Sequence, residues 1–97
     1  MKKKITDVTL PASTTIIGEK AFCDCVALTN VTLSDGIVEI GYGAFKDCSA
    51  LSSVTIPDSV TKIDQSFLEC RNIKATYKGA TYDYEHIEDL YSAINGK

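Results

Sequence analysis

The sequence has little of what catalysis, phosphate binding or membrane insertion requires. Its 97 residues include one histidine, His86, and carry a net charge of −3 with a pI near 5.0. Without an excess of Lys and Arg, the long-range attraction that brings proteins to nucleic acid is missing. No apolar run approaches the about 20 residues that a membrane-spanning helix needs. We therefore predict neither a nucleic-acid partner nor membrane insertion.

An export signal is not recognisable either. The basic cluster Lys2-Lys3-Lys4 is followed by Thr6 and Asp7, which interrupt the apolar core that a signal peptide needs after its positive start. As written, the chain is expected to be cytoplasmic. A surface or secreted location is expected instead if its native N-terminus is missing.

The residues that could carry out chemistry have simpler explanations. His86 lies beside the apolar stripe of a predicted helix and is expected to be solvated or part of a capping turn. Gly41-x-Gly43 is too short for a phosphate loop. Four acidic residues are expected to cap the same helix, because they lack the spacing of a calcium loop; they are Asp83, Glu85, Glu88 and Asp89. We predict a protein that is not an enzyme and has no cofactor and no metal site.

The chain repeats itself with a period of 23 residues. Apolar residues recur at this spacing in several columns at once, which chance rarely produces. The columns include Val8, Val31 and Val54; Leu10, Leu33 and Ile56; Ile17, Ile40 and Ile63; and Leu28 and Leu51. A period of about 20 to 29 residues is typical of leucine-rich repeats rather than of helical repeats.

Each unit predicts two extended segments and a compact turn region. Alternation such as that of residues 31–33 indicates a strand with one buried face. Pro11 and Pro57 are expected to end the strands of the first and third units, and Ser34-Asp35-Gly36 that of the middle unit. Second extended segments are expected over 14–17, 37–40 and 60–63. Gly18 and Gly41 are then expected to permit a sharp bend. The pattern Ala-Phe-x-x-Cys-x-x-Leu spaces apolar residues by three and favours one or two turns of α- or 3₁₀-helix.

Three of the four cysteines share one repeat column, because Cys25, Cys48 and Cys70 take equivalent places in successive units. Residues in one column stack along a repeat protein, so these thiols are expected to be buried packing groups. The phenylalanines expected to fill the interior in the same way are Phe22, Phe45 and Phe67. Cys23 is expected to face solvent or a groove, and its C-x-C spacing argues against a zinc site.

The pattern I-G-x-x-A-F-x-x-C-x-x-L-x-x-V-x-I-P-x-S-V-x-x-I occurs at 40–63 and nearly so at 17–40. It resembles the BspA-like class of bacterial leucine-rich repeats, and the resemblance covers about residues 5–76. Proteins of this class resemble surface or secreted adhesins and scaffolds. The resemblance implies protein–protein contact through a stacked sheet, with no catalytic residues to carry over. The few repeats and the missing export signal depart from the pattern.

The last part of the chain predicts a cap. Two strands are expected over 73–77 and 80–82 about the turn Lys78-Gly79. Apolar spacing then predicts a helix over about 84–95, with Asp83 as its N-cap and Asn95-Gly96 as its end. A hairpin and helix in this position would cover the core of the last coil.

At the N-terminus the sequence predicts no comparable cap. Ile5 already occupies the column of Leu28 and Leu51, so the chain enters the repeat at a strand. Because open strand edges pair readily, we predict a homodimer through the edge formed by residues 5–11, with the lysine run as a partial guard.

Candidate contact residues follow from the strand alternation. If Val31 and Leu33 point inward, Asn30 and Thr32 point outward, together with their repeat mates. The two polar rows are Asp7, Asn30 and Ser53, and Thr9, Thr32 and Thr55. Further candidates are Lys74 and Lys78, which would add positive charge to this face, and Tyr42, which would lie opposite the strands. Threonine columns also have a purely structural explanation, because β-branched neighbours stabilise an exposed sheet.

These expectations describe one domain, residues 1–97. We predict an α/β-type repeat, mostly β, that forms a right-handed leucine-rich-repeat solenoid of about three 22–23 residue coils over 5–76, closed by a hairpin–helix cap over 77–97. We expect a protein-binding module that acts through the strand face or the cap tyrosines, which are Tyr77, Tyr82, Tyr84 and Tyr91. Two alternatives stay open: a terminal piece of a longer surface array, and a small intracellular inhibitor or adaptor.

Overall fold

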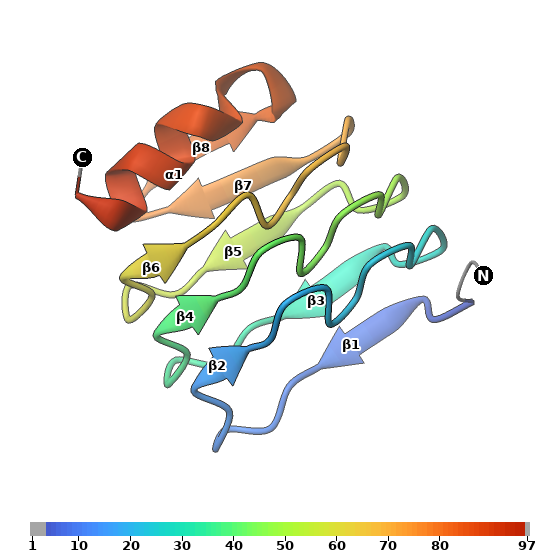
Figure 1. Ribbon diagram of the computed structural model, residues 1–97, viewed down its shortest axis with the longest axis horizontal. Helices are drawn as coiled ribbons and strands as arrows, with labels where there is room; N and C mark the ends of the chain where they lie inside the picture. Colours follow the sequence, from blue (N-terminus) through green and yellow to red (C-terminus); the bar gives the residue numbers. More distant parts are fainter. Residues whose placement is uncertain (1–3, 97) are drawn as a thin grey trace.

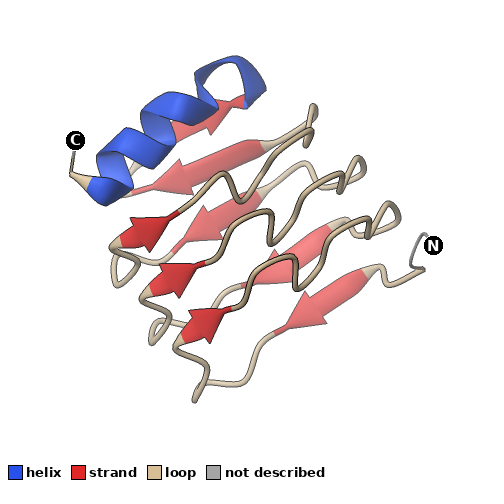
Figure 2. Cartoon of the chain, in the orientation of Figure 1, coloured by secondary structure: helices blue, strands red, loops and turns tan. Residues whose placement is uncertain are grey.

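The computed structural model describes residues 4–96 as short strands followed by a helix (Figures 1 and 2). The strands are β1 (Asp7–Thr9), β2 (Ile16–Ile17), β3 (Asn30–Thr32), β4 (Glu39–Ile40), β5 (Val54–Ile56), β6 (Lys62–Ile63), β7 (Lys74–Tyr77) and β8 (Ala80–Asp83). A 3₁₀-helix over Tyr84–His86 leads into α1 (Ile87–Asn95). The chain is therefore a mostly-strand repeat protein with a C-terminal helix.

Most strands pair in parallel, one repeat apart. Val8 of β1 lies opposite Val31 of β3, and β2, β4 and β6 pair in the same way. A single bridge from Asn30 to Ser53 joins β3 to β5, and β5 pairs with β7. Figure 1 shows the resulting stack of coils, with β2, β4 and β6 on the near side and β1, β3, β5 and β7 behind them.

The repeat columns form the interior, as the period predicts. Leu51 and Phe45 are fully buried. The ring of Phe45 stacks on those of Phe22 and Phe67, with centroids 5.4 and 5.5 Å away and planes inclined by 10°. Burying one large apolar side chain contributes roughly 1.5–3 kcal/mol. Repetition of the same packing in each coil therefore supplies the stability of the stack.

The predicted cysteine column is buried, and its members are Cys25, Cys48 and Cys70. The thiol of Cys48 donates to the carbonyl oxygen of Phe22 at 3.1 Å, and that of Cys70 donates to Phe45 at 2.8 Å. Hydrogen bonding with Cys70 and burial raise the pKa of the Cys48 thiol. The Cys48 thiol therefore packs in its protonated form, whereas Cys23 is half-buried.

The helical turns predicted after each second strand are wrong. The described coils contain successive hydrogen-bonded turns there, because residues with positive φ recur and interrupt a right-handed helix. They are Lys20, Gly43 and Gln65 at one repeat position and Asp24, Asp47 and Glu69 at another. The backbone bonds to the next coil instead: the N–H of Phe22 donates to Ala44 at 2.7 Å, and that of Phe45 donates to Ser66 at 2.8 Å.

Glycine is needed at position 41 for a reason other than the predicted bend. Gly18 and Gly41 have ordinary φ values, and the left-handed residue of the turn is Gly43, with φ 62°. A Cβ on Gly41 would lie 2.8 Å from the backbone nitrogen of Glu19, closer than real Cβ atoms approach. The glycine therefore lets the backbones of two coils pack against each other.

The predicted hairpin and helix are confirmed. β7 and β8 pair antiparallel about Lys78 and Gly79, whose φ values of 49° and 85° fit a type I′ turn. Asp83 caps the following 3₁₀ turn by accepting a hydrogen bond from the N–H of His86. Gly96 ends α1 in the left-handed conformation, with φ 75°.

Side chains of α1 cover the last coil. Leu90 is fully buried. The amide of Asn95 donates to the carbonyl oxygen of Ile63 and accepts from the N–H of Ile63, both at 2.9 Å. The hydroxyl of Tyr91 accepts from the N–H of Phe67 at 3.0 Å. These side-chain atoms take the places that the backbone of a further coil would fill.

Candidate binding surface

Threonines form one continuous row across the face of β1, β3, β5, β7 and β8. The bridge between Asn30 and Ser53 keeps β3 and β5 in register, so the row does not break between them. It consists of Thr9, Thr32, Thr55, Thr76 and Thr81. Strand neighbours lie about 4.8 Å apart. The three threonines predicted from the repeat are thus extended by two from the hairpin into a regular ladder of hydroxyl and methyl groups.

A second polar row runs beside the threonines. It consists of Asp7, Asn30, Ser53, Lys74 and Asp83. The side-chain amide of Asn30 donates to a carboxylate oxygen of Asp7 at 2.9 Å. Lys74 pairs in register with Asp83, so the charges along the row are mixed in sign. The predicted polar residues of the strands therefore lie together on one face.

The two rows border a shallow hollow of about 310 Å³ between β3 and β5. Its polar lining includes Thr32, Ser53, Thr55 and Asp35. The hollow lies where these strands are joined by one bridge only, whereas β1 and β3 pair over three residues. This face offers hydroxyl groups and a carboxylate to a partner, with Val31 and Leu33 beneath them.

Lys78 and the cap tyrosines make contacts within the cap itself. The ammonium of Lys78 lies over the ring of Tyr77, 5.4 Å from its centroid. Tyr77 and Tyr91, two of the candidate cap tyrosines, are buried. Burial raises the pKa of the Tyr91 hydroxyl, which is held by Phe67. Tyr82 and Tyr84 are half-buried against the core.

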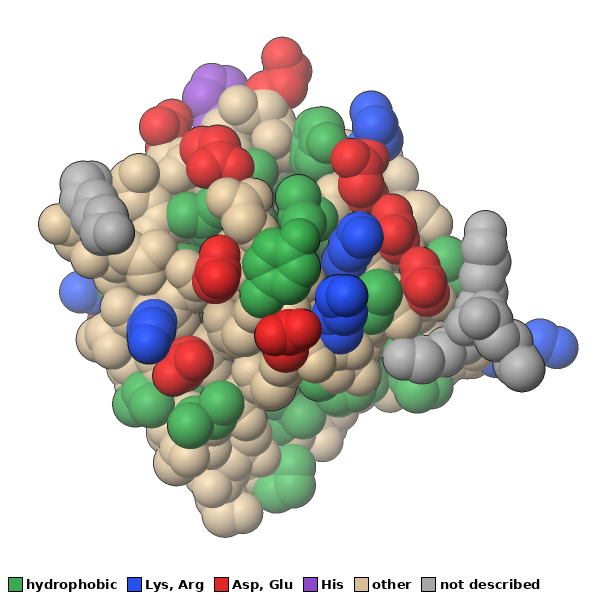
Figure 3. All heavy atoms as spheres, viewed as in Figure 1, with side chains coloured by type: hydrophobic (Ala, Val, Ile, Leu, Met, Phe, Trp, Pro, Cys, Tyr) green, Lys and Arg blue, Asp and Glu red, His purple; other side chains and the backbone are tan. Residues whose placement is uncertain are grey.

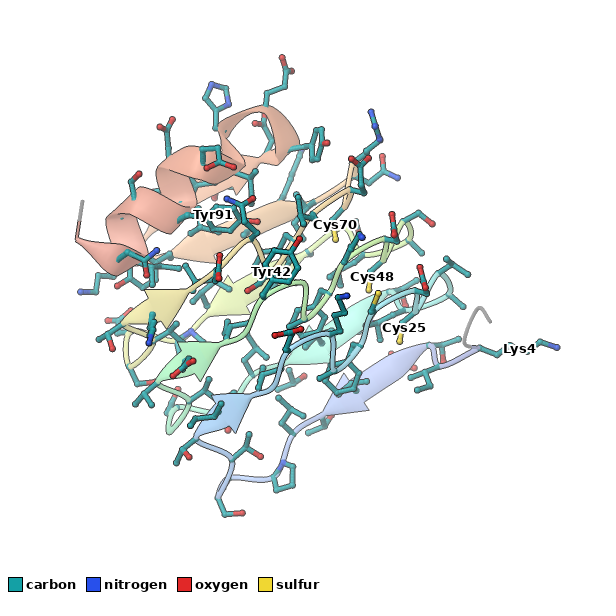
Figure 4. The ribbon with its side chains drawn as sticks, viewed as in Figure 1. Lys4, Cys25, Tyr42, Cys48, Cys70 and Tyr91 are labelled. Carbon is teal, nitrogen blue, oxygen red and sulfur yellow. The ribbon has the colours of Figure 1, made fainter. Side chains whose placement is uncertain are left out.

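Tyr42 lies on the opposite side of the molecule from the threonine row. Figure 4 shows its ring on the side of β2, β4 and β6, and in Figure 3 apolar, acidic and basic side chains mingle on that side. The side chain is 38% exposed and borders a hollow of about 280 Å³ together with Glu19, Glu39 and Asp64. Tyr42 is therefore an exposed candidate, as predicted, but it shares no surface with the strand candidates.

Ile16 is an exposed residue that sequence reasoning missed. It is 57% exposed, whereas its neighbour Ile17 is buried and pairs with Ile40 in the adjacent coil. The same alternation that placed Asn30 and Thr32 outward could have found it. The second extended segments thus have an outward face of their own.

His86 takes part in the capping turn, in agreement with the prediction. Its ring Nδ1 lies 2.7 Å from a carboxylate oxygen of Asp83. Hydrogen bonding to His86 lowers the pKa of Asp83, and the same bond raises the pKa of His86. Both side chains are well exposed, so the pair serves the cap and is not enclosed in a cleft.

Metal binding and membrane crossing find no structural support in residues 4–96. No group of three or more His, Cys, Asp or Glu side chains in this part of the chain is placed to hold a metal ion. None of the described helices has the length and apolarity to cross a membrane.

The stacked coils have known relatives. The family model described as "BspA type Leucine rich repeat region (6 copies)" matches residues 1–85. The chain belongs to the BspA-type leucine-rich repeat family. No curated protein matches the chain.

Solved structures of bacterial leucine-rich repeat proteins resemble it. One from Bacteroides capillosus is 39% identical with a TM-score of 0.73, over 78% of this chain and 56% of that one. A leucine rich cell surface protein from Faecalibacterium prausnitzii is 28% identical with a TM-score of 0.70, over 81% of this chain and 23% of that one. A leucine rich repeat protein from T. pallidum is 28% identical with a TM-score of 0.51, over 70% and 43%. The BspA-type chain therefore spans between about a quarter and somewhat over half the length of these proteins.

Proposed function

We propose that this BspA-type chain is a non-enzymatic protein-binding module, a short right-handed solenoid that contacts its partner through the face of β1, β3, β5 and β7. The observation that carries the proposal is the pair of aligned polar rows on that face. Protein interfaces contain direct hydrogen bonds, and the hydroxyl, amide and carboxylate groups of these rows can supply them. Membership of a leucine-rich repeat family supports protein binding in general.

The threonine row favours this face over the cap tyrosines. Tyr77 and Tyr91 use their hydroxyls inside the molecule, toward Val60 and Phe67. The side chains of Thr9, Thr32 and Thr55 are exposed. A partner therefore reaches the hydroxyls of the row without any rearrangement of the core.

The test is an affinity capture with a matched control on the opposite face. Thr32→Lys/Thr55→Lys places two long charged side chains in the row and should abolish capture of the partner from source-cell or host-cell extracts. Thr15→Lys/Thr61→Lys makes the same change at two exposed threonines beside β2 and β6 and should leave capture intact. Equal capture by both double variants would refute the strand face as the contact.

A second candidate function is the terminal section of a longer array on the bacterial surface. Two observations favour it: α1 closes the C-terminal end of the stack, and the chain spans only part of its structural relatives. The name of the Faecalibacterium relative as a cell surface protein supports an extracellular location over the cytoplasmic one expected from the sequence. Intact-mass measurement of the native polypeptide in surface and cytosolic fractions tests both points. A 97-residue cytosolic polypeptide would contradict them.

A further inference from the structure

The parallel strands of the binding face part between β3 and β5. On either side of this place, β1 pairs with β3 and β5 pairs with β7 over three residues each. Only the bridge from Asn30 to Ser53 joins β3 to β5, and it lies where both strands begin. The hollow of about 310 Å³ opens toward the carboxyl ends of the two strands, where Leu33 and Asp35 line one side and Thr55 and Pro57 the other. The face therefore has one recess within an otherwise paired sheet.

The recess has an apolar floor and polar walls. Val31 and Leu33 line it and are 8% and 9% exposed, whereas Val54, the repeat mate of Val31 in the next coil, is 2% exposed. The exposed side chains of Thr32 and Thr55 stand beside this floor. Ligand pockets in proteins have volumes of about 300–1,000 Å³. This recess is at the lower limit, so it has room for a single side chain of a partner.

A carboxylate stands at the rim of the recess. The side chain of Asp35 is exposed and has no hydrogen bond or ion pair within residues 4–96. The turn that carries it is held in place, because the hydroxyl of Ser34 donates to the carbonyl oxygen of Pro11 at 3.2 Å and the N–H of Ile37 donates to that of Ser34 at 3.2 Å. The position of this negative charge is therefore fixed by the coil, before any partner arrives.

The surroundings of the recess are also negative. Asp58, the repeat mate of Asp35, is exposed and lines the adjoining hollow together with Asp35. Neither hollow is lined by a Lys or Arg among the described residues. Of the lysine run predicted to guard the strand edge, Lys4 is exposed, and Lys2 and Lys3 lie outside the described residues. A positively charged group is therefore the electrostatic complement of this part of the face.

We propose that the recess receives a basic side chain of the protein partner, an inference that rests on the proposed contact through the strand face. The methylene stem lies over Val31 and Leu33, and the cationic head meets the carboxylate of Asp35. Long basic side chains bury an apolar stem in this way while their charge stays at the solvent. Arginine is favoured over lysine, because its planar fork can donate two parallel hydrogen bonds to one carboxylate.

A defined probe tests the recess separately from capture of the partner. N-acetyl-arginine amide, titrated into the isotope-labelled chain, should shift the amide NMR signals of Thr32, Asp35 and Thr55 in a saturable way. N-acetyl-citrulline amide has nearly the same shape and no charge. It should bind at least about threefold more weakly, which is the effect of losing one exposed charge pair.

Two aspartate variants locate the effect. Asp35→Asn keeps the shape of the side chain and should weaken binding of the arginine probe at least about threefold, with binding of the citrulline probe unchanged. Asp64→Asn removes an exposed carboxylate from the opposite side, beside Glu39 and Tyr42, and should bind both probes like the wild type. In the capture experiment Asp35→Asn should retain less partner than Asp64→Asn.

Three results would overturn the proposal: equal binding of the two probes by the wild type, an Asp35→Asn chain that binds the arginine probe normally, or shifts confined to residues outside the recess. If Thr32→Lys/Thr55→Lys still abolishes capture, any of these results refutes the basic side chain and leaves the strand face as the contact. Normal capture by Thr32→Lys/Thr55→Lys refutes the strand-face contact itself, whatever the probes show.

Discussion

At the C-terminal end of the stack, side chains of α1 replace a further coil, whereas at the N-terminal end the first coil leaves its edge and part of its core uncovered by residues 4–96. The N–H of Phe45 donates to the backbone of the third coil, and the equivalent N–H of Phe67 donates to the hydroxyl of Tyr91. The edge of β6 is paired by the amide of Asn95. The difference shows how a repeat stack is ended: the stop needs polar atoms at the positions of the missing backbone, not apolar cover alone.

The largest expected effect comes from removing the apolar part of the closed end. Leu90→Ala should lower the free energy of unfolding by about 2–5 kcal/mol, because Leu90 is fully buried between α1 and the last coil. Ile16→Ala, at the open end, should cost less than about 0.5 kcal/mol, since that side chain is 57% exposed. Urea unfolding measures both values. Similar losses would mean that the two ends are equally covered in solution.

Removing the polar part of the closed end should have the next largest effect. Asn95→Ala leaves the N–H and C=O of Ile63 without partners at a partly buried edge, and should cost about 1–3 kcal/mol. Ser92→Ala on the same helix is the control, because that side chain is exposed. Equal urea midpoints for the two variants would show that water replaces the Asn95 amide at no cost.

One repeat position compares an inner coil with the open end directly. Gly41→Ala should destabilise the protein by about 1–3 kcal/mol, because the new methyl group meets the backbone of Glu19. Gly18→Ala should be neutral or stabilise the protein by up to about 1 kcal/mol. The added methyl group meets open space, and alanine lowers the conformational entropy of the unfolded chain relative to glycine. Thermal unfolding checks the pair. A costly Gly18→Ala would mean that backbone packs against this end of the stack.

Repetition made the strands of the coils predictable, whereas the ends of the stack do not repeat and the turns depend on backbone conformations that residue type barely reveals. Each coil repeats the inward alternation of Val31 and Val54, so the strands, their register and the buried columns could be inferred from the period. The turns were mistaken for helix because the three-residue spacing of apolar side chains is the same in both. Left-handed conformations at Asp24 and Asp47 decide between them, and these leave only a weak trace in residue type.

The candidate surface was predictable as far as it follows strand alternation. The outward positions of Asn30 and Thr32 follow from strand alternation, because Val31 between them points inward. The extension of the row to Thr81 depends instead on an antiparallel register within the cap. The role of Asn95 could not be inferred, because an asparagine at a helix end has a local explanation as a stop signal. Its contact with Ile63 joins segments 32 residues apart.

The smallest expected effect concerns pH at the start of the cap. The bond between Asp83 and His86 raises the pKa of His86 above its ordinary value of 6.5 and lowers that of Asp83 below its ordinary value of 3.8. The His86 contribution to stability is complete below 6.5 and is lost as pH rises through its raised pKa in the folded state. The Asp83 contribution is complete above 3.8 and is lost as pH falls through its lowered pKa.

The pair should therefore stabilise the cap most between pH 3.8 and 6.5. His86→Gln should lower the melting temperature slightly in that window and have less effect at alkaline pH, where the wild-type imidazole is neutral. Asp89 and Glu85 also raise the pKa of His86, so Asp83→Asn should reduce the pH dependence without abolishing it. An effect of His86→Gln that does not change with pH would mean that the ring supports the cap through packing and neutral hydrogen bonding. The closed end would then depend on uncharged contacts throughout, since the bonds of Asn95 and Tyr91 carry no charge.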